Sequence, residues 1–427
     1  MHPLFYFCII MKIKSLLLLL LVANYSIAQQ QIKKVLFIGN SYTAVNDLPL
    51  LLSNVAQSAG DSVIYESNCI GGYTFQLHTT NSTTLQKINQ GDFDFVVLQE
   101  QSQLPSFPIS QVQSSVYPYA KTLDSLINLA NSCTETVFYM TWGRKNGDAS
   151  NCPNWPPVCT YSGMDSLLRL RYQDMATTNN ALVSPVGAVW RYIRDNYPNI
   201  ELYNADESHP SLAGSYAAAC TFYSILFRKD PTSITFVSTL DSTDASAIRN
   251  AAKLVAFDSL SFWNVGNYDI DVNFTYSYFS STGVIFMNET QNCDSILWDF
   301  GDGTQSSGGT PIHIYQQGGS YTVTLVGYRC NETDTFILQV PTIQAGLNEN
   351  QKNEIRISNI SKSGLISLEG DMHDIQQIDI INPEGKIIYS TRNISNTIPL
   401  ISNNGGLYLL NIHYENFVRP IKFFFSK

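Results

Sequence analysis

Short apolar runs alternate with longer amphipathic stretches over the first 265 residues of the chain. The apolar runs have the length of buried strands and occupy residues 34–38, 93–98, 137–141 and 181–186. The amphipathic stretches have helical spacing and occupy residues 48–59, 114–130 and 215–227. Apolar strands separated by helices predict a parallel sheet with helices on both faces, and therefore an α/β domain of three layers.

The pattern changes at about residue 266, where apolar and polar positions begin to alternate with a period of two. Tyr321, Val323 and Leu325 fall on one face of such a strand. This predicts a β-sandwich over 266–342, a polar linker over 343–352 and a second small all-β sandwich domain over 353–427. Turn signals at 382–385 and 403–406 punctuate the last of these domains.

The N-terminus has the pattern of a secretory signal. Lys12 and Lys14 precede an apolar run at 16–22, and small residues follow at 26–28. The run is too short to span a bilayer comfortably. We therefore expect a signal peptide at 1–28, a first mature domain at 29–265 and a secreted or cell-surface protein.

Composition narrows the classes of function. Hydrophobic residues make up 44% of the chain, which is enough for packed cores, and 25 basic against 35 acidic residues give a net charge of 25 − 35 = −10. An acidic chain without a basic tract is not expected to bind nucleic acid. No Cys and His spacing indicates zinc, and we expect no cofactor.

The chain has 8 cysteines, and export permits disulfides. Cys152 and Cys159 bracket a proline-rich loop that a disulfide would close. Cys293 and Cys330 flank a predicted β region and are expected to pair across it. Outside the signal peptide, three cysteines then remain, and at least one of them is expected to be free and buried: Cys69, Cys133 and Cys220.

A serine follows the first apolar strand, in Gly39-Asn40-Ser41. Ligand sites in open α/β sheets form at the carboxyl ends of strands, so Ser41 is a candidate nucleophile at that edge. Its own backbone N–H is a candidate oxyanion donor. The alternative is an ordinary serine at the start of a helix.

A serine nucleophile needs a base, and the first mature domain has two histidines, His78 and His209. Asp206 precedes His209 by three residues, and this spacing lets the carboxylate orient the imidazole. His78 has no carboxylate nearby in the sequence. We therefore predict His209 as the base, with Asp206 as its partner and His78 as a structural or substrate-side group.

These blocks resemble the SGNH (GDSL-like) hydrolases over about residues 33–225. Asn40 stands where that family has Asp, and 210–214 extends the Asp206–His209 block. The resemblance implies a flavodoxin-like sheet and a second oxyanion donor at Gly72, with Gly71 as the alternative. The family's third donor is an Asn, for which Gln101 is the best match here and Gln99 the alternative. The implied reaction is acyl transfer through an acyl-enzyme, without a cofactor.

Aromatic residues follow the third apolar strand. Trp142, Trp155 and Tyr161 could form a wall on which a sugar stacks, or the core of a packed loop. The first interpretation favours a carbohydrate ester, such as an acetylated glycan, as substrate.

Two further resemblances concern the β domains. The Trp298–Thr304 turn, with His313 and Tyr321 downstream, resembles a PKD domain, which implies a spacer or binding module. Asp299 and Asp302 are read there as turn residues and not as a calcium site. The end of the chain, with strand-like runs at 378–388 and 406–410, resembles a type IX secretion C-terminal sorting domain. The secretion machinery is therefore an expected partner.

The sequence as a whole predicts a secreted serine esterase with catalytic Ser41, Asp206 and His209. The alternative is a non-catalytic glycan-binding or adhesion protein built on the same scaffold.

Overall fold

The structure, a computed structural model, describes residues 30–342, 355–361, 364–383, 386–400, 406–415 and 418–425. The predicted signal peptide at 1–28 and the predicted linker at 343–352 lie outside the described residues. Contacts divide the chain into one unit that ends at Asn267 and a second unit that begins at Tyr268.

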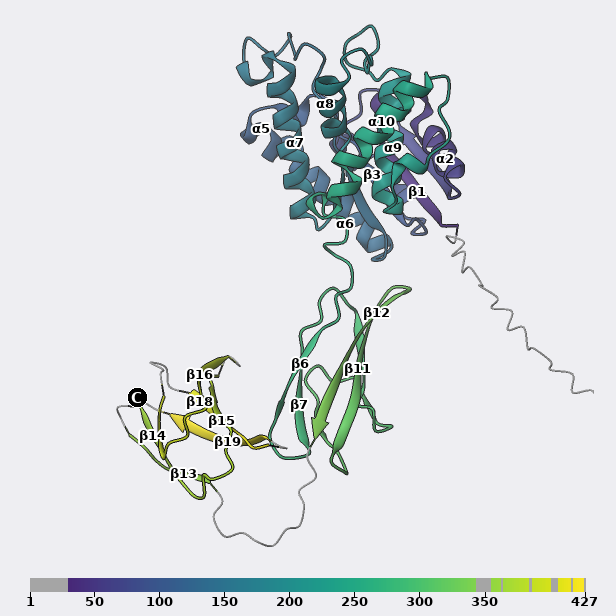
Figure 1. Cartoon of the computed structure of the whole chain (residues 1–427). Helices are drawn as coiled ribbons and strands as arrows, with labels where there is room; N and C mark the ends of the chain where they lie inside the picture. Colours follow the sequence, from purple (N-terminus) through teal and green to yellow (C-terminus); the bar gives the residue numbers. More distant parts are fainter. Residues whose placement is uncertain are drawn as a thin grey trace, which may run out of the picture. The chain divides into compact units, whose positions relative to one another are not determined.

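The first unit is built on a five-stranded parallel sheet in the order β2-β1-β3-β4-β5 (Figure 1). Its strands are β1 (Ile32–Gly39), β2 (Ser62–Cys69), β3 (Phe95–Leu98), β4 (Glu135–Tyr139) and β5 (Leu182–Ser184). From β1 the chain passes to β2 on one side and then to β3 on the other. The carboxyl ends of β1 and β3 therefore flank the switch point at which doubly wound sheets bind ligands.

Helices cover both faces of this sheet, which confirms the predicted α/β class (Figure 1). They are α1 (Ser41–Ala44), α2 (Leu48–Ser58), α3 (Phe75–His78), α4 (Ser82–Ile88), α5 (Ile109–Ser115), α6 (Tyr117–Ala130), α7 (Tyr161–Thr178), α8 (Val186–Asn196), α9 (Leu212–Phe227) and α10 (Ser242–Val255). Helix α9 packs against α2, α8 and α10, while α6 packs against α3, α4, α5 and α7. Helix α9 is buried along nearly its whole length, so it is the central helix of its layer.

Two expectations about these elements are corrected, and one strand had not been predicted. The predicted helix at 114–130 is two helices that meet at Val116, because Pro118 in the first turn of α6 cannot continue the preceding helix. The fourth strand is shorter than predicted, since Val186 already belongs to α8. Strand β2 was not predicted, because this edge strand carries polar residues and buries little apolar surface.

The second unit consists of antiparallel sheets. One module has sheets β10-β7-β6 and β12-β11-β8-β9. Its strands are β6 (Phe274–Tyr278), β7 (Gly283–Asn288), β8 (Ser295–Asp299), β9 (Gln305–Ser306), β10 (Ile312–Ile314), β11 (Gly319–Arg329) and β12 (Glu332–Thr342). Val323 and Leu325 are buried on one face of β11 beside Trp298, as the alternating pattern predicted.

The remaining module has sheets β13-β14-β17 and β16-β15-β18-β19 and a core of its own. Its strands are β13 (Arg356–Ile360), β14 (Leu365–Glu369), β15 (Gln377–Ile381), β16 (Ile387–Thr391), β17 (Thr397–Pro399), β18 (Gly406–His413) and β19 (Val418–Phe425). The two all-β regions predicted from the alternating pattern are therefore present.

The cysteines follow the predictions in part. Cys152 and Cys159 form the predicted disulfide, and Cys220 is free and buried. The predicted pair of Cys293 and Cys330 is wrong, because Cys293 carries a free thiol. Cys330 lies in the turn between β11 and β12 and is disulfide-bonded, so its partner is another cysteine.

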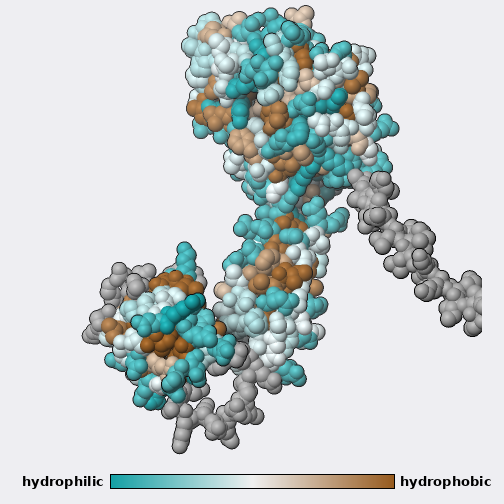
Figure 2. Space-filling model, viewed as in Figure 1, coloured by the Kyte–Doolittle hydropathy of each residue, from teal (hydrophilic) through white to brown (hydrophobic). Residues whose placement is uncertain are grey.

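Hydrophobic residues at the surface form scattered patches among hydrophilic ones over each part of the chain (Figure 2). Each helix among the described residues is too short or too polar to cross a bilayer.

Candidate active site

The turn between β1 and α1 presents Ser41 at the carboxyl edge of the sheet. Asn40 caps the helix, because its side-chain oxygen accepts a hydrogen bond from the Tyr42 N–H at 3.1 Å. A Cβ on Gly39 would lie 2.8 Å from both Gln99 Oε1 and Thr43 Oγ1. A side chain on Gly39 would therefore displace the Gln99 amide and the Thr43 hydroxyl.

The close approach of this turn to β3 brings it into contact with Gln99. Its Oε1 accepts hydrogen bonds from the Asn40 N–H at 2.9 Å and from the Thr43 hydroxyl at 3.0 Å, and its Nε2 donates to the Glu100 carbonyl. The side chain is fully buried. Gln99 therefore fixes the turn that carries Ser41, and its amide is not free to act as an oxyanion donor.

Ser41, His209 and Asp206 meet at this edge. The His209 Nε2 lies 2.8 Å from the Ser41 Oγ, and the His209 Nδ1 is hydrogen-bonded to the Asp206 Oδ2. Asp206 Oδ1 accepts from the backbone N–H of Ser208 at 3.1 Å and of His209 at 3.0 Å. Partial burial acts to raise the pKa of Asp206, but the hydrogen bonds from His209 and Ser208 outweigh it and lower that pKa below 3.8. Asp206 is therefore a carboxylate at neutral pH.

The loop that carries Asp206 and His209 is held by the segment after β4. The Trp142 Nε1 donates to the Ser208 carbonyl at 3.1 Å, and the Lys145 N–H donates to the Glu207 carbonyl at 2.9 Å. Glu207 has a left-handed backbone, with φ of 59°, and its carboxylate accepts from Asn146 Nδ2 at 2.9 Å. These contacts hold a strained loop in one conformation.

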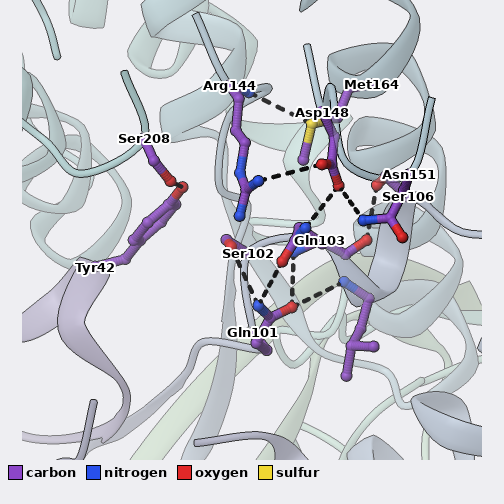
Figure 3. Close-up of polar contacts among 11 residues, drawn as sticks. Tyr42, Gln101, Ser102, Gln103, Ser106, Arg144, Asp148, Asn151, Met164 and Ser208 are labelled. Carbon is purple, nitrogen blue, oxygen red and sulfur yellow. Dashed lines mark hydrogen bonds and ion pairs between the residues drawn. The ribbon is translucent and has the colours of Figure 1, made fainter. Parts of the chain in front are cut away.

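An aromatic stack supports the same loop. Trp142 lies between Tyr42, at a centroid distance of 4.8 Å, and Trp190, at 3.7 Å, and it is fully buried. The predicted contact of Trp142 with substrate is wrong, because both faces of its ring are covered. The Tyr42 hydroxyl lies 2.6 Å from Ser208 Oγ (Figure 3). Trp155 is half-buried, and its Nε1 donates to the Ser106 carbonyl at 2.9 Å.

His78 lies under the nucleophile turn and is not placed to contact substrate. Its Nε2 is 2.9 Å from the Gly39 carbonyl and its Nδ1 is 2.8 Å from Thr84 Oγ1, while its side chain is fully buried. The carbonyl can only accept, so Nε2 carries the proton. Burial lowers the pKa of His78, against the opposing effect of the hydrogen bond to Gly39. The structural role predicted for His78 fits this position and the substrate-side role does not.

Gly72 lies in the turn after β2, where the Tyr73 N–H donates to the Ile70 carbonyl at 3.1 Å. Its φ of 75° is a left-handed value, which favours Gly72 over Gly71 as the residue that needs to be glycine. The Asn40 Nδ2 donates to the Tyr73 carbonyl at 3.0 Å and ties this turn to the nucleophile. Among the described residues, neither the Ser41 N–H nor the Gly72 N–H has an acceptor.

The predicted third donor, Gln101, is turned away from this role (Figure 3). Its Nε2 donates to Gln103 Oε1 at 3.0 Å and to Ser102 Oγ at 3.4 Å. Its Oε1 accepts from the backbone N–H of Gln103 at 2.8 Å and of Leu104 at 3.2 Å. The prediction is contradicted because the amide folds back to close its own turn.

Several residues at this edge were not assigned from the sequence. Arg144 and Asp148 form an ion pair beside Gln103, with 3.2 Å between Arg144 Nη1 and Asp148 Oδ1. Glu100 is buried directly after β3, where its carboxyl group accepts from the backbone N–H groups of Phe75 and Gln101. In the sequence, the only sign of a role for Arg144, Asp148 and Glu100 was their position after a predicted apolar strand. Within the described residues, no three His, Cys, Asp or Glu side chains gather as a metal site.

Comparisons with known proteins identify one module. Residues 283–335 match the family model described as PKD domain, which confirms the predicted PKD domain over that segment. No curated protein matches the chain significantly.

Solved structures similar to this chain include a DUF4886 family protein from Bacteroides uniformis. That protein is 18% identical, with a TM-score of 0.46, over 54% of this chain and 95% of that one. A putative SGNH hydrolase from Slackia heliotrinireducens is 26% identical, with a TM-score of 0.37, over 45% of this chain and 97% of that one. The PKD1 domain of Vibrio anguillarum Epp is 28% identical, with a TM-score of 0.17, over 18% of this chain and 94% of that one. At TM-scores below 0.5 these similarities do not bear on the chemistry, which rests on the contacts around Ser41.

Proposed function

We propose that the first domain is a serine esterase of the SGNH type, with Ser41 as nucleophile, His209 as general base and Asp206 as the group that orients the base. The observation that carries this proposal is the distance of 2.8 Å from His209 Nε2 to Ser41 Oγ, with Asp206 on the opposite ring nitrogen. This arrangement gives a serine hydroxyl a proton acceptor and gives the imidazolium that forms a neighbouring negative charge.

The reaction has two steps. Ser41 Oγ bonds to the ester carbonyl carbon while His209 Nε2 takes the hydroxyl proton. The tetrahedral intermediate collapses, the bond to the alcohol oxygen breaks, and His209 protonates the leaving alcohol. A water molecule then attacks the acyl-enzyme, with His209 again taking a proton, and releases the carboxylic acid and free Ser41.

The oxyanion of each intermediate needs hydrogen-bond donors, and we propose the N–H groups of Ser41 and Gly72. Both lack an acceptor among the described residues, and the Asn40 side chain ties the Gly72 turn to the serine turn. One such donor contributes about 3 kcal/mol to lowering the barrier. The SGNH resemblance implies a third oxyanion donor, but no candidate for it remains. The side-chain amides of Gln99 and Gln101 both donate to other groups of the protein.

The test uses a fluorophosphonate probe and para-nitrophenyl acetate. The wild-type protein should be labelled and should hydrolyse the ester, and Ser41→Ala should lose both while keeping the wild-type melting temperature. Ser114→Ala, which removes an exposed hydroxyl on α5, is the matched control and should keep both. Unchanged labelling of Ser41→Ala would rule out Ser41 as nucleophile, and an unlabelled wild-type protein would favour a non-catalytic binding protein on this scaffold.

An acetylated glycan is the substrate class that we propose from the aromatic residues near the site. Trp142 is buried and cannot stack on a sugar, so Trp155 and Tyr161, both half-buried, are the aromatic residues left for this role. The test measures acetate released from acetylated polysaccharides and from lipid esters. Faster release from lipid esters would count against a glycan substrate.

Export is part of the same proposal. It is supported by the signal-like pattern at 1–28 and by the Cys152–Cys159 disulfide, a bond typical of oxidising compartments. We propose that the module at 355–425 directs passage through the type IX secretion machinery. Deletion of residues 353–427 should then retain the protein in the periplasm, and normal release of the shortened chain would exclude this role.

A further inference from the structure

Arg144 lies just after β4, at the same edge of the sheet as Ser41. Its Nη1 is 3.2 Å from Asp148 Oδ1, and the arginine side chain is 26% exposed. Among the described residues, Asp148 is the only acceptor for its guanidinium. The arginine side chain is therefore partly exposed while most of its guanidinium donors are unused.

Asp148 holds the Arg144 guanidinium in place. Its Oδ2 accepts from Gln103 Nε2 and from Asn151 Nδ2, both at 2.6 Å, and the side chain has no exposed surface. Burial acts to raise the pKa of Asp148, but the hydrogen bonds from Gln103 and Asn151 and the charge of Arg144 outweigh it and lower that pKa. The Cys152–Cys159 disulfide closes the loop that follows. Asp148 is thus a buried carboxylate in a rigid frame, and it gives the arginine one orientation.

The end of the guanidinium away from Asp148 lies on the side of Tyr42 and Ser102, whose own side chains are buried (Figure 3). Tyr42 follows the nucleophile in the chain, and its ring meets the His209 ring edge-on at 5.3 Å. Arg144 therefore lies on the side of the site where Tyr42 meets His209.

The hydrogen bonding of Arg144 is incomplete. Its Nε is buried and has no partner among the described residues. A buried donor without an acceptor is costly, so such groups in a folded protein call for an explanation. A ligand cannot reach the buried Nε, so only the other guanidinium donors are available to one.

The charge of Arg144 also acts on the Tyr42 hydroxyl. Burial raises the pKa of the Tyr42 phenol, while hydrogen bonds with Ser208 and Ser102 and the charge of Arg144 act in the opposite direction. Asp206 opposes Arg144 at the same hydroxyl, and its effect is the smaller one. An anion beside Tyr42 would therefore be attracted by Arg144.

We propose that Arg144 determines specificity in this site by binding a carboxylate of the substrate, so that the esters hydrolysed are esters of acidic molecules. This rests on the proposed esterase function. A guanidinium oriented by a buried carboxylate suits a planar anion better than it suits a neutral group. The carboxylate could belong to the acyl part or to the alcohol part of the ester, and the experiment has an arm for each.

The test compares matched esters. For the alcohol part the pair is para-acetoxybenzoate and its methyl ester, and for the acyl part it is mono-para-nitrophenyl glutarate and para-nitrophenyl pentanoate. In at least one pair the wild-type protein should prefer the anionic ester in kcat/KM, less so at high salt. Arg144→Gln should lower that preference by roughly 10- to 100-fold, and Arg144→Lys by less. Lys121→Gln, an equal change of charge on α6, should leave the preference unchanged.

A second measurement does not depend on turnover. Calorimetry should detect para-acetoxybenzoate or the glutarate ester binding to Ser41→Ala protein, and Arg144→Gln in that background should remove the binding. An unchanged preference in Arg144→Gln, an equal loss for both members of each pair, or binding that survives the substitution would overturn the proposal. Failure of wild-type protein to hydrolyse any ester, with arginine-dependent binding intact, would instead refute the esterase function alone.

Discussion

The side-chain amide of Asn40 joins two parts of the site, since its Nδ2 donates to the Tyr73 carbonyl at 3.0 Å while its Oδ1 accepts from the Tyr42 N–H at 3.1 Å. The residue is 2% exposed. The same side chain thus caps the helix of the nucleophile and holds the turn that contains Gly72. The SGNH hydrolases have aspartate at this position. An aspartate can accept a hydrogen bond from the Tyr42 N–H, but it has no N–H to donate to the Tyr73 carbonyl.

Asn40→Asp should therefore weaken both stability and catalysis. A carboxylate at this position would face the Tyr73 carbonyl without a donor, and we expect the free energy of unfolding to fall by about 1–3 kcal/mol. Release of the Gly72 turn should lower kcat more than it changes KM, because the oxyanion forms only during the reaction. Urea denaturation and steady-state kinetics check both effects. A variant with wild-type kcat would show that the contact with Tyr73 is not needed for catalysis.

Asp206→Asn should lower kcat by about 10³- to 10⁴-fold with little change in the fold, because an amide no longer stabilises the required tautomer and charge of His209. The pKa of Asp206 lies below 3.8, so Asp206 stays ionised at mildly acidic pH. Its contribution to stability is present above pH 3.8 and is lost as the pH falls through its value in the folded protein. Thermal melts at pH 3 to 7, with kinetics at neutral pH, test both points, and a loss of less than about tenfold would contradict the role of Asp206.

Glu100 gives a prediction about pH and stability. Burial raises its pKa to about 8, from an ordinary 4.5, against the backbone hydrogen bonds from Gln101 and Phe75. The folded chain keeps this proton between pH 4.5 and 8 while the unfolded chain loses it, so the free energy of unfolding should fall across that range. Glu100→Gln cannot ionise and should gain stability relative to wild type as the pH rises. Urea denaturation at pH 5 and pH 8 measures this, and parallel changes in the two proteins would disprove it.

The Cys152–Cys159 disulfide should stabilise the loop that follows Asp148. For so short a loop, loss of the bond should lower the free energy of unfolding by about 2 kcal/mol. The paired substitution Cys152→Ser with Cys159→Ser, compared with the single substitution of the free Cys69→Ser, separates this effect from loss of a thiol. Equal melting temperatures of the wild type and the double variant would exclude a stabilising role.

The sequence predicted the parts of the fold that rest on burial. Strands β1, β3, β4 and β5 are apolar runs. Such a run can be recognised from its own residues, without knowledge of the strands beside it. Strand β2 was missed because it lies at the sheet edge, where polar residues such as Glu66 and Asn68 are tolerated. The break at Val116 was missed because the apolar period continues through it, although Pro118 was a usable signal.

For the site, the spacing of Asp206 and His209 was informative because both lie in one short loop. Contacts between residues far apart in the chain could not be predicted from the sequence in the same way. Gln101 was expected to face a substrate, but its side chain has enough torsions to fold back onto Gln103. Trp142 was open to two interpretations, a sugar-stacking wall or the core of a packed loop, and nothing in the sequence placed Trp190 behind it.

The separation of 168 positions between Ser41 and His209 has a consequence for biosynthesis. A ribosome completes the nucleophile long before it adds the base, so a nascent or prematurely terminated chain that ends before residue 206 has a serine with no proton acceptor. Hydrolytic power should therefore arise only when the whole first domain has been made and has closed.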